Sequence, residues 1–348
     1  MKLIFRWYGP RDTIPLAYIS QIPGLEGVCT AYYDAKPGEL WSLPALLEMK
    51  RELEAHDLKM EVIESIPVSE NIKLGNAFAE HDIEVWRKNV EICAKAGIKV
   101  VCYNFMPVFD WLRTDMKHPN RDGSTSLAYS AEDFAKVDPN NLHLPGWDES
   151  YSPEELQSLL KQYQSISHEQ LFKNMVHFLR AVIPTCERLG VSLAVHPDDP
   201  PWDIFNLPRI VSNERDLDAL FEAVPSLNNG LTLCTGSFGA GRNNDLVHMA
   251  GKYAKRIHYA HLRNICYTDD SNGFVESGHL SKSGSLDMAA IVKALVDHGF
   301  DGYVRPDHGR NVFGEDGKPG YGLYDRALGC AYINGLFEAI EKYGGDKK

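Results

Sequence analysis

Four side chains that are able to bind a metal ion stand at the ends of four consecutive apolar segments in the C-terminal half of the sequence. They are His196, Cys234, His261 and Asp307. Two imidazoles, one thiolate and one carboxylate form a donor set that suits Zn(II), Fe(II) or Mn(II). The thiolate argues against Mg(II) and Ca(II), which prefer oxygen ligands. Taken singly, each residue has a more ordinary explanation, as a hydrogen-bonded histidine, a small buried cysteine or a capping aspartate.

The order of polar and apolar residues in these segments indicates where the four side chains point. Successive side chains of a strand face opposite sides of the sheet. If His196 and Cys234 face inward, Ala194 and Thr232 do so too, while the intervening aliphatic residues face outward. Segment 256–262 fits this pattern less well, because it would turn a second histidine outward.

Two further residues, His308 and Tyr321, are candidates for proton transfer near the same place. An unperturbed imidazole titrates close to neutral pH, and Tyr321 stands between two glycines that allow a close approach to a substrate. We also expect Asp198 or Asp199 to orient a ligand imidazole, since both follow His196 in a proline-rich turn. A solvated turn is the simpler alternative for these two aspartates.

Three arginines stand close to the proposed metal ligands in the sequence: Arg263, Arg305 and Arg310. A guanidinium group binds a carboxylate through two parallel hydrogen bonds. We therefore predict that these arginines bind an acidic substrate. The alternative is a surface salt bridge for Arg263 and Arg310, and a pairing with Asp307 for Arg305.

These residues need a scaffold that brings strand ends together, and the sequence alternates between strand-like and helix-like segments. This alternation is typical of a parallel α/β fold. Eight strands favour a (β/α)8 barrel, or TIM barrel, in which the C-terminal strand ends surround one active-site mouth. A doubly wound sheet is less favoured, because the first strand lacks the Gly-rich turn that binds nucleotides. The expected strands span 2–8, 26–32, 59–65, 98–104, 191–197, 230–236, 256–262 and 302–308. The expected helices span 42–55, 78–96, 168–189, 213–223, 243–254, 287–298 and 323–343.

The 348 residues are predicted to form one barrel domain, residues 1–348, with extended loops at the active-site face. One long connection, at about 105–166, follows the fourth strand. Long connections in compact domains are commonly functional, and we expect this insertion to act as a lid or as an oligomer contact. The glycine-containing loop 263–286 is a second, weaker candidate for a lid.

Composition limits the setting in which the protein works. There are 36 Lys and Arg against 48 Asp and Glu, and the formal net charge is −12. Such an acidic chain is not expected to bind nucleic acid. The seven cysteines are odd in number and form no C-x-x-C pair, which suits a reducing compartment. No signal peptide or membrane span is evident, so a cytoplasmic protein without membrane contact is expected.

Several sequence blocks together carry a family resemblance. They are V-C-Y-N-F-M-P-V at 101–108, A-V-H-P-D-D-P-P at 194–201, L-C-T-G-S at 233–237, H-L-R at 261–263, R-P-D-H-G at 305–309 and P-G-Y at 319–321. With these blocks the chain closely resembles the mannonate dehydratase family over essentially its whole length. The resemblance implies a metal-dependent barrel of the xylose-isomerase-like type.

The resemblance also implies an activity: dehydration of D-mannonate to 2-dehydro-3-deoxy-D-gluconate in hexuronate and glucuronate catabolism, with Mn(II) or Fe(II). It implies that the four strand-end residues bind the metal and that His308 and Tyr321 exchange protons with the substrate. A homo-oligomer, a dimer or larger, is expected, with a small sugar acid as the binding partner. Two alternatives stay open, a metal-dependent aldose–ketose isomerase or epimerase on the same fold and a non-catalytic protein that binds sugar acids or senses a metal.

Overall fold

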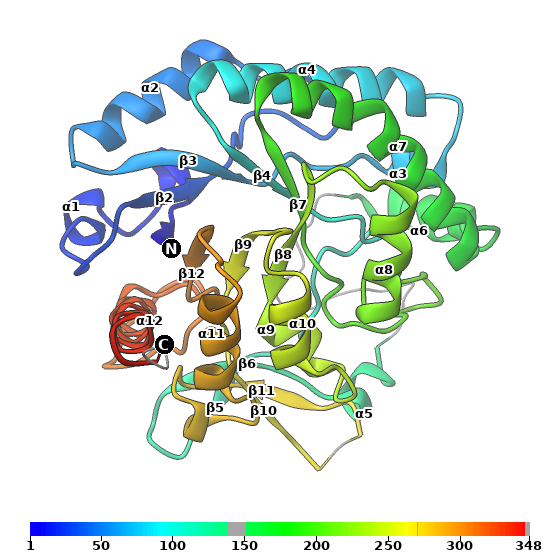
Figure 1. Cartoon of the computed structure of the whole chain (residues 1–348). Coiled ribbons are helices and arrows are strands. Elements are labelled where there is room, and N and C mark those ends of the chain that lie inside the picture. The colour runs from blue at the N-terminus through cyan, green and yellow to red at the C-terminus, as the bar shows by residue number, and fades with distance from the viewer. Residues whose placement is uncertain (138–150, 270, 345–348) are drawn as a thin grey trace.

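The computed structural model describes residues 1–137, 151–269 and 271–344, and its centre is a closed barrel of eight parallel strands (Figure 1). Around the barrel the strands follow the order β1-β12-β9-β8-β7-β4-β3-β2. The predicted (β/α)8 barrel is therefore confirmed. The strands are β1 (Lys2–Arg6), β2 (Gly27–Thr30), β3 (Lys59–Glu64), β4 (Val100–Tyr103), β7 (Ser192–Val195), β8 (Asn229–Cys234), β9 (Ile257–His261) and β12 (Tyr303–Arg305).

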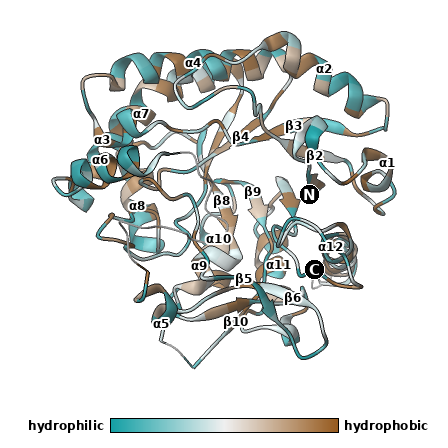
Figure 2. Ribbon diagram, turned by 180° about the vertical axis from the view of Figure 1, so that it is seen from behind, coloured by the Kyte–Doolittle hydropathy of each residue, from teal (hydrophilic) through white to brown (hydrophobic). Residues whose placement is uncertain are grey.

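Helices surround the barrel, and their ends follow local sequence signals. Helix α7 begins after Ser167, whose side chain accepts a hydrogen bond from the Gln170 amide, and ends at Gly190 in the left-handed conformation. Figure 2 shows apolar strands at the centre and mixed polar and apolar residues on the helices around them. The longer helices are α2 (Leu43–Glu54), α4 (Ala79–Ala96), α6 (Pro153–Tyr163), α7 (His168–Leu189), α8 (Glu214–Ala223), α11 (Met288–Asp297) and α12 (Leu323–Tyr343). The shorter ones are α1 (Leu16–Ile19), α3 (Glu70–Leu74), α5 (Ala131–Phe134), α9 (Thr235–Ala240) and α10 (Leu246–Lys252), with 3-10 turns at Gly9–Arg11 and Ser281–Ser283.

Side chains inside the barrel and side chains facing the helices form two separate buried clusters. The larger cluster, between strands and helices, includes Leu193, Leu231 and Val304. The smaller cluster consists of Ile4, Cys29, Val62, Val100, Cys102, Ala194, Tyr259 and Tyr303. Because strand side chains alternate, the residue two positions after an interior residue faces the mouth of the barrel. The strand geometry thus turns polar residues toward the mouth: Arg6, Glu64, His196, His261 and Arg305.

A second, four-stranded antiparallel sheet lies below β8 and β9 in the view of Figure 1. Its order is β10-β11-β6-β5, with β5 (Asp115–Pro119), β6 (Thr125–Tyr129), β10 (Ile265–Tyr267) and β11 (Phe274–Glu276). It joins the two long connections, which were expected to be loops, through the pairing of Phe274 with Tyr129 and of Val275 with Ala128. Because these partner strands are far apart in the sequence, no local sequence pattern predicts their pairing. Residues 138–150 of the first connection lie outside the described residues.

Gly27 provides a test of barrel closure. A Cβ at this position would lie 2.3 Å from the Lys59 carbonyl oxygen on the neighbouring strand β3, a contact with rigid backbone. We predict that Gly27→Ala lowers the free energy of unfolding by about 1–3 kcal/mol. Gly335 on α12 has no atom within 4 Å of the corresponding position, so Gly335→Ala is the matched control and stabilises by about 0.5–1 kcal/mol. Urea unfolding of both variants measures the difference, and equal stability of the two would contradict this packing.

Candidate active site and metal centre

Three of the four predicted metal ligands lie together at the mouth of the barrel. One donor atom from each of His196, Cys234 and His261 lies within 4.8 Å of the other two. Strands β8 and β9 end at Cys234 and His261, and His196 directly follows β7. The three side chains therefore come from adjacent strands, as the barrel requires.

The histidines are arranged as ligands with free nitrogen atoms. His196 Nδ1 lies 2.7 Å from the Pro197 carbonyl oxygen. A carbonyl only accepts, so Nδ1 carries the proton and Nε2 keeps its lone pair. His261 is fully buried, and neither of its ring nitrogens has a hydrogen-bond partner among the described residues. Buried polar atoms are normally hydrogen-bonded, so these bare nitrogens and the soft thiol beside them fit a metal ion.

The fourth predicted ligand, Asp307, lies beside this group and is also paired with an arginine. Its carboxylate oxygens are 3.6 Å from Cys234 Sγ and 3.7 Å from His261 Nδ1. Arg305 Nη2 lies 2.9 Å from the same carboxylate. Burial alone would raise the pKa of Asp307, but electrostatic interactions with His308 and Arg305 outweigh it and hold this pKa well below the usual range. The carboxylate is therefore ionised and available for a cation.

The thiol of Cys234 is in contact with a hydroxyl group. Ser237 Oγ lies 3.0 Å from Cys234 Sγ and 3.0 Å from Asp199 Oδ2. The expectation that Asp198 or Asp199 orients a ligand imidazole is wrong. Asp199 instead acts through Ser237 on the cysteine, and Asp198 accepts hydrogen bonds from the Val211 amide and the Ser212 hydroxyl.

The two residues predicted to transfer protons touch each other. His308 Nε2 lies 2.7 Å from the Tyr321 hydroxyl. On the other side of the ring, Nδ1 lies 2.8 Å and 3.0 Å from the two carboxylate oxygens of Glu276. Arg263 Nη1 also lies 3.0 Å from Nδ1, but the Glu276 carboxylate is closer and only accepts, so Nδ1 carries a proton and Nε2 is the acceptor for the phenol. Burial, with Tyr8 and Asp307 nearby, raises the pKa of Tyr321 well above its ordinary value, so the phenol stays protonated.

Glu276 belongs to a buried network of alternating charges. Arg263 Nη1 and Arg113 Nη2 both lie 2.8 Å from Glu276 Oε1. The same arginines hold Asp199, at 2.8 Å and 2.7 Å. Burial would raise the pKa of Glu276, but His308 and the two arginines lower it to about 2. The carboxylate therefore stays ionised beside the histidine.

Arg305 and Glu64 form a second charged pair, inside the mouth. Arg305 donates to both oxygens of Glu64, at 3.1 Å and 2.7 Å, and Glu64 Oε2 lies 3.5 Å from His261 Nε2. Burial opposes ionisation, but Arg305 and His261 keep the pKa of Glu64 well below its ordinary range. Arg310 differs, because it is half-buried and pairs with Asp122 and Asp325 at 3.0 Å. All three arginines of the sequence prediction are thus paired with carboxylates.

Sequence reasoning did not find three contributors: Glu64, Glu276 and Arg113. Glu64 could have been found from the sequence, since it lies near the end of the predicted strand 59–65, just as the metal ligands lie near the ends of theirs. Arg113 and Glu276 lie in the two long connections, and only the pairing of β6 with β11 brings these connections together.

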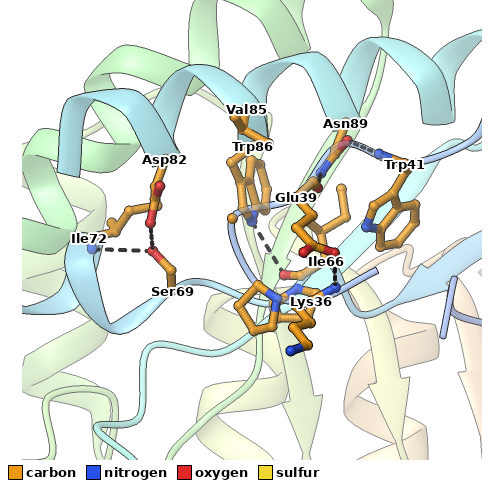
Figure 3. Close-up of a pocket in the computed structure, with 13 residues that line it drawn as sticks. Lys36, Glu39, Trp41, Ile66, Ser69, Ile72, Asp82, Val85, Trp86 and Asn89 are labelled. Atoms are coloured by element: carbon orange, nitrogen blue, oxygen red, sulfur yellow. Dashed lines mark hydrogen bonds between the residues drawn. The ribbon is translucent and has the colours of Figure 1, made fainter. Parts of the chain in front are cut away.

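A small hollow between α4 and the segments 36–41 and 66–72 is unrelated to this site (Figure 3). Its volume is about 10 Å³, which is room for about one water molecule. The Asn89 side chain and the Ser69–Asp82 hydrogen bond occupy its walls. Separately, none of the helices in the described part of the chain has the length and apolar character that a bilayer crossing requires.

Comparison with known proteins places the chain in a family. The profile of the D-mannonate dehydratase (UxuA) family matches residues 1–347. A mannonate dehydratase of Streptococcus equi subsp. zooepidemicus is 48% identical over 99% of this chain and 96% of that protein. Mannonate dehydratase 2 of Halalkalibacterium halodurans is 46% identical over 98% of this chain and 99% of that protein. The crystal structure of mannonate dehydratase from Streptococcus suis serotype 2 superposes with a TM-score of 0.93 at 45% identity, covering 99% of this chain and 96% of that one.

More distant structures share only the barrel. An L-ribulose 3-epimerase superposes with a TM-score of 0.58 at 14% identity, over the full length of both chains. Fold and site thus define a (β/α)8-barrel enzyme with a group of side chains able to bind a metal ion at the C-terminal ends of its strands. The chain belongs to the D-mannonate dehydratase family, and it is a hydro-lyase.

Proposed function

We propose that this enzyme dehydrates D-mannonate to 2-dehydro-3-deoxy-D-gluconate and water, as a step of hexuronate and glucuronate breakdown. The observation that carries the proposal is the hydrogen-bonded pair His308–Tyr321 directly beside the metal-ligand group. A relative that is 48% identical to this chain bears the name mannonate dehydratase. A cytoplasmic homo-oligomer remains our expectation, as does a lid or contact role for the insertion at about 105–166.

His196, Cys234, His261 and Asp307 are the residues proposed to hold Mn(II) or Fe(II). When bound, such an ion supplies a Lewis acid that stabilises negative charge developing on the oxygens of the substrate. The two bare nitrogens of His261 and the ionised Asp307 support this assignment.

The elimination must remove the proton at C2 and expel the hydroxyl group at C3. His308 is proposed as the base, since its Nε2 is an acceptor while Glu276 holds Nδ1–H. Tyr321 is proposed as the acid, because its raised pKa keeps the proton on the phenol until the C3 hydroxyl leaves as water. The 2.7 Å contact between the two side chains then allows the proton from C2 to return to Tyr321. The enol that remains tautomerises to the 2-keto acid.

The three arginines were predicted to bind the substrate, and this role stays a prediction. Arg263 and Arg305 already have a second effect, since they keep Glu276, Asp307 and Glu64 ionised. Arg310 forms an ion pair with Asp325, and Asp325 directly precedes the buried Arg326 in the sequence.

Turnover of D-mannonate tests the proposed function directly. Purified protein loaded anaerobically with Mn(II) or Fe(II) is expected to convert D-mannonate into a 2-keto-3-deoxy acid, detected by its keto group. Metal-free protein is the control and is expected to lose most of this activity. Absence of product from the metal-loaded enzyme would falsify the assignment, and an interconverted sugar as product would favour an isomerase or epimerase.

Glu276 is proposed as a positioning residue for His308, and Glu276→Gln tests it. The two arginines favour the amide oxygen, which turns the amide NH2 toward His308 Nδ1 and favours the tautomer with its proton on Nε2. A base with the wrong tautomer loses about 10²–10⁴ in kcat. We predict such a loss with metal content and KM little changed. Steady-state kinetics and metal analysis measure both, with Glu276→Asp, which keeps the charge, as the partial rescue. Equal losses in both variants would indicate a purely structural role.

A further inference from the structure

The positive charges around the mouth of the barrel differ in whether they are already paired. Arg113, Arg263 and Arg305 each form ion pairs with carboxylates at 2.7–2.8 Å. Arg326 is buried and donates to the backbone carbonyls of Gly322, Tyr321 and Arg6. These four guanidinium groups are therefore already held by the protein itself, although Arg263 Nε and Arg305 Nη1 have no hydrogen-bond partner among the described residues.

Arg6 is different. It is the last residue of β1, two positions after the interior residue Ile4, so its side chain faces the mouth. Its Nη1 donates to the backbone carbonyl of Glu64, whose carboxylate is occupied by Arg305 and Tyr259. Within residues 1–137, 151–269 and 271–344, no ion pair joins Arg6 to a carboxylate. The side chain is half-buried, so it also reaches solvent at the mouth.

Aromatic rings hold the Arg6 guanidinium on the same side of the mouth as the proposed acid. Its Cζ lies 4.9 Å from the centre of the Tyr8 ring and 6.0 Å from that of Tyr33. The Tyr8 ring packs edge-on against Tyr321, with 5.1 Å between centroids. Such packing limits the rotamers of a long side chain and leaves its planar donor edge preorganised. The Tyr8 ring thus contacts both Arg6 and Tyr321, the proposed acid.

We propose that Arg6 binds the carboxylate group of the sugar-acid substrate. The inference rests on the proposed function, and it names the group that would recognise the acid. A guanidinium fork matches a carboxylate in two parallel hydrogen bonds. With a net charge of −12 on the chain, a local cation that no carboxylate neutralises favours the binding of an anionic substrate. Arg6 supplies it at the mouth without breaking any of the buried ion pairs.

The binding of two unreactive ligands tests the proposed role of Arg6. The probes are 3-deoxy-D-mannonate, which lacks the leaving hydroxyl, and its neutral amide, titrated by calorimetry into the Mn(II)-loaded enzyme. The wild-type protein is expected to prefer the acid. Arg6→Met should weaken binding of the acid by roughly 10- to 150-fold, as expected for a hydrogen-bonded charged group, and change binding of the amide by less than about threefold. Arg6→Lys keeps the positive charge but lacks the two parallel donors of a guanidinium group. Its affinity for the acid should therefore lie between those of the wild type and Arg6→Met.

Arg11→Met is the matched control, because it removes one positive charge shortly after the same strand from a residue that is 75% exposed and paired with Asp34. It should bind both probes as the wild type does. Unchanged binding of the acid by Arg6→Met, or equal weakening of acid and amide, would overturn the inference while the wild-type enzyme still turns over D-mannonate. A wild-type enzyme that neither binds the acid nor turns over D-mannonate would overturn the proposed function, and the inference with it. Circular dichroism and metal content establish that each variant is folded and loaded.

Discussion

The arrangement at the mouth of this barrel depends on the pairing of buried charges. Removing an ionised group from water costs several kcal/mol, and an opposite charge with good hydrogen-bond geometry offsets that cost. Arg113 and Arg263 are almost fully buried and each bridges Asp199 and Glu276. Removing any one of the four would leave the other three with an unbalanced buried charge. The network therefore allows little freedom in where these side chains lie.

Both halves of the site are attached to this network. On one side, Asp199 and Ser237 fix the Cys234 thiol among the proposed metal ligands. On the other, Glu276 fixes the His308 ring and so determines which nitrogen faces Tyr321. The small antiparallel sheet contributes β11, the strand that ends at Glu276, and Arg113 lies two residues before β5. Its pairing across two distant connections thus has a chemical consequence at the barrel mouth.

Much of this could be predicted from the sequence, because a barrel converts strand position into spatial proximity. Apolar alternation located all eight strands, and the rule that strand ends converge was enough to bring His196, Cys234 and His261 together. Applied to the first three strands as well, the same rule would have found Arg6 and Glu64. Glu276 and the new role of Asp199 could not be found in this way. Their partners are set by long-range sheet pairing and by competition among several carboxylates for two arginines, and neither leaves a local pattern.

We propose that Cys234, with His196, His261 and Asp307, forms a site for one divalent metal ion. The most direct test is the absorption spectrum of the enzyme titrated with Co(II) under reducing, anaerobic conditions, because a thiolate bound to cobalt gives an intense near-ultraviolet charge-transfer band. We predict that this band saturates at one Co(II) per chain and is absent from Cys234→Ser. Stoichiometric binding of Co(II) without the band, or an unchanged band in Cys234→Ser, would contradict the account.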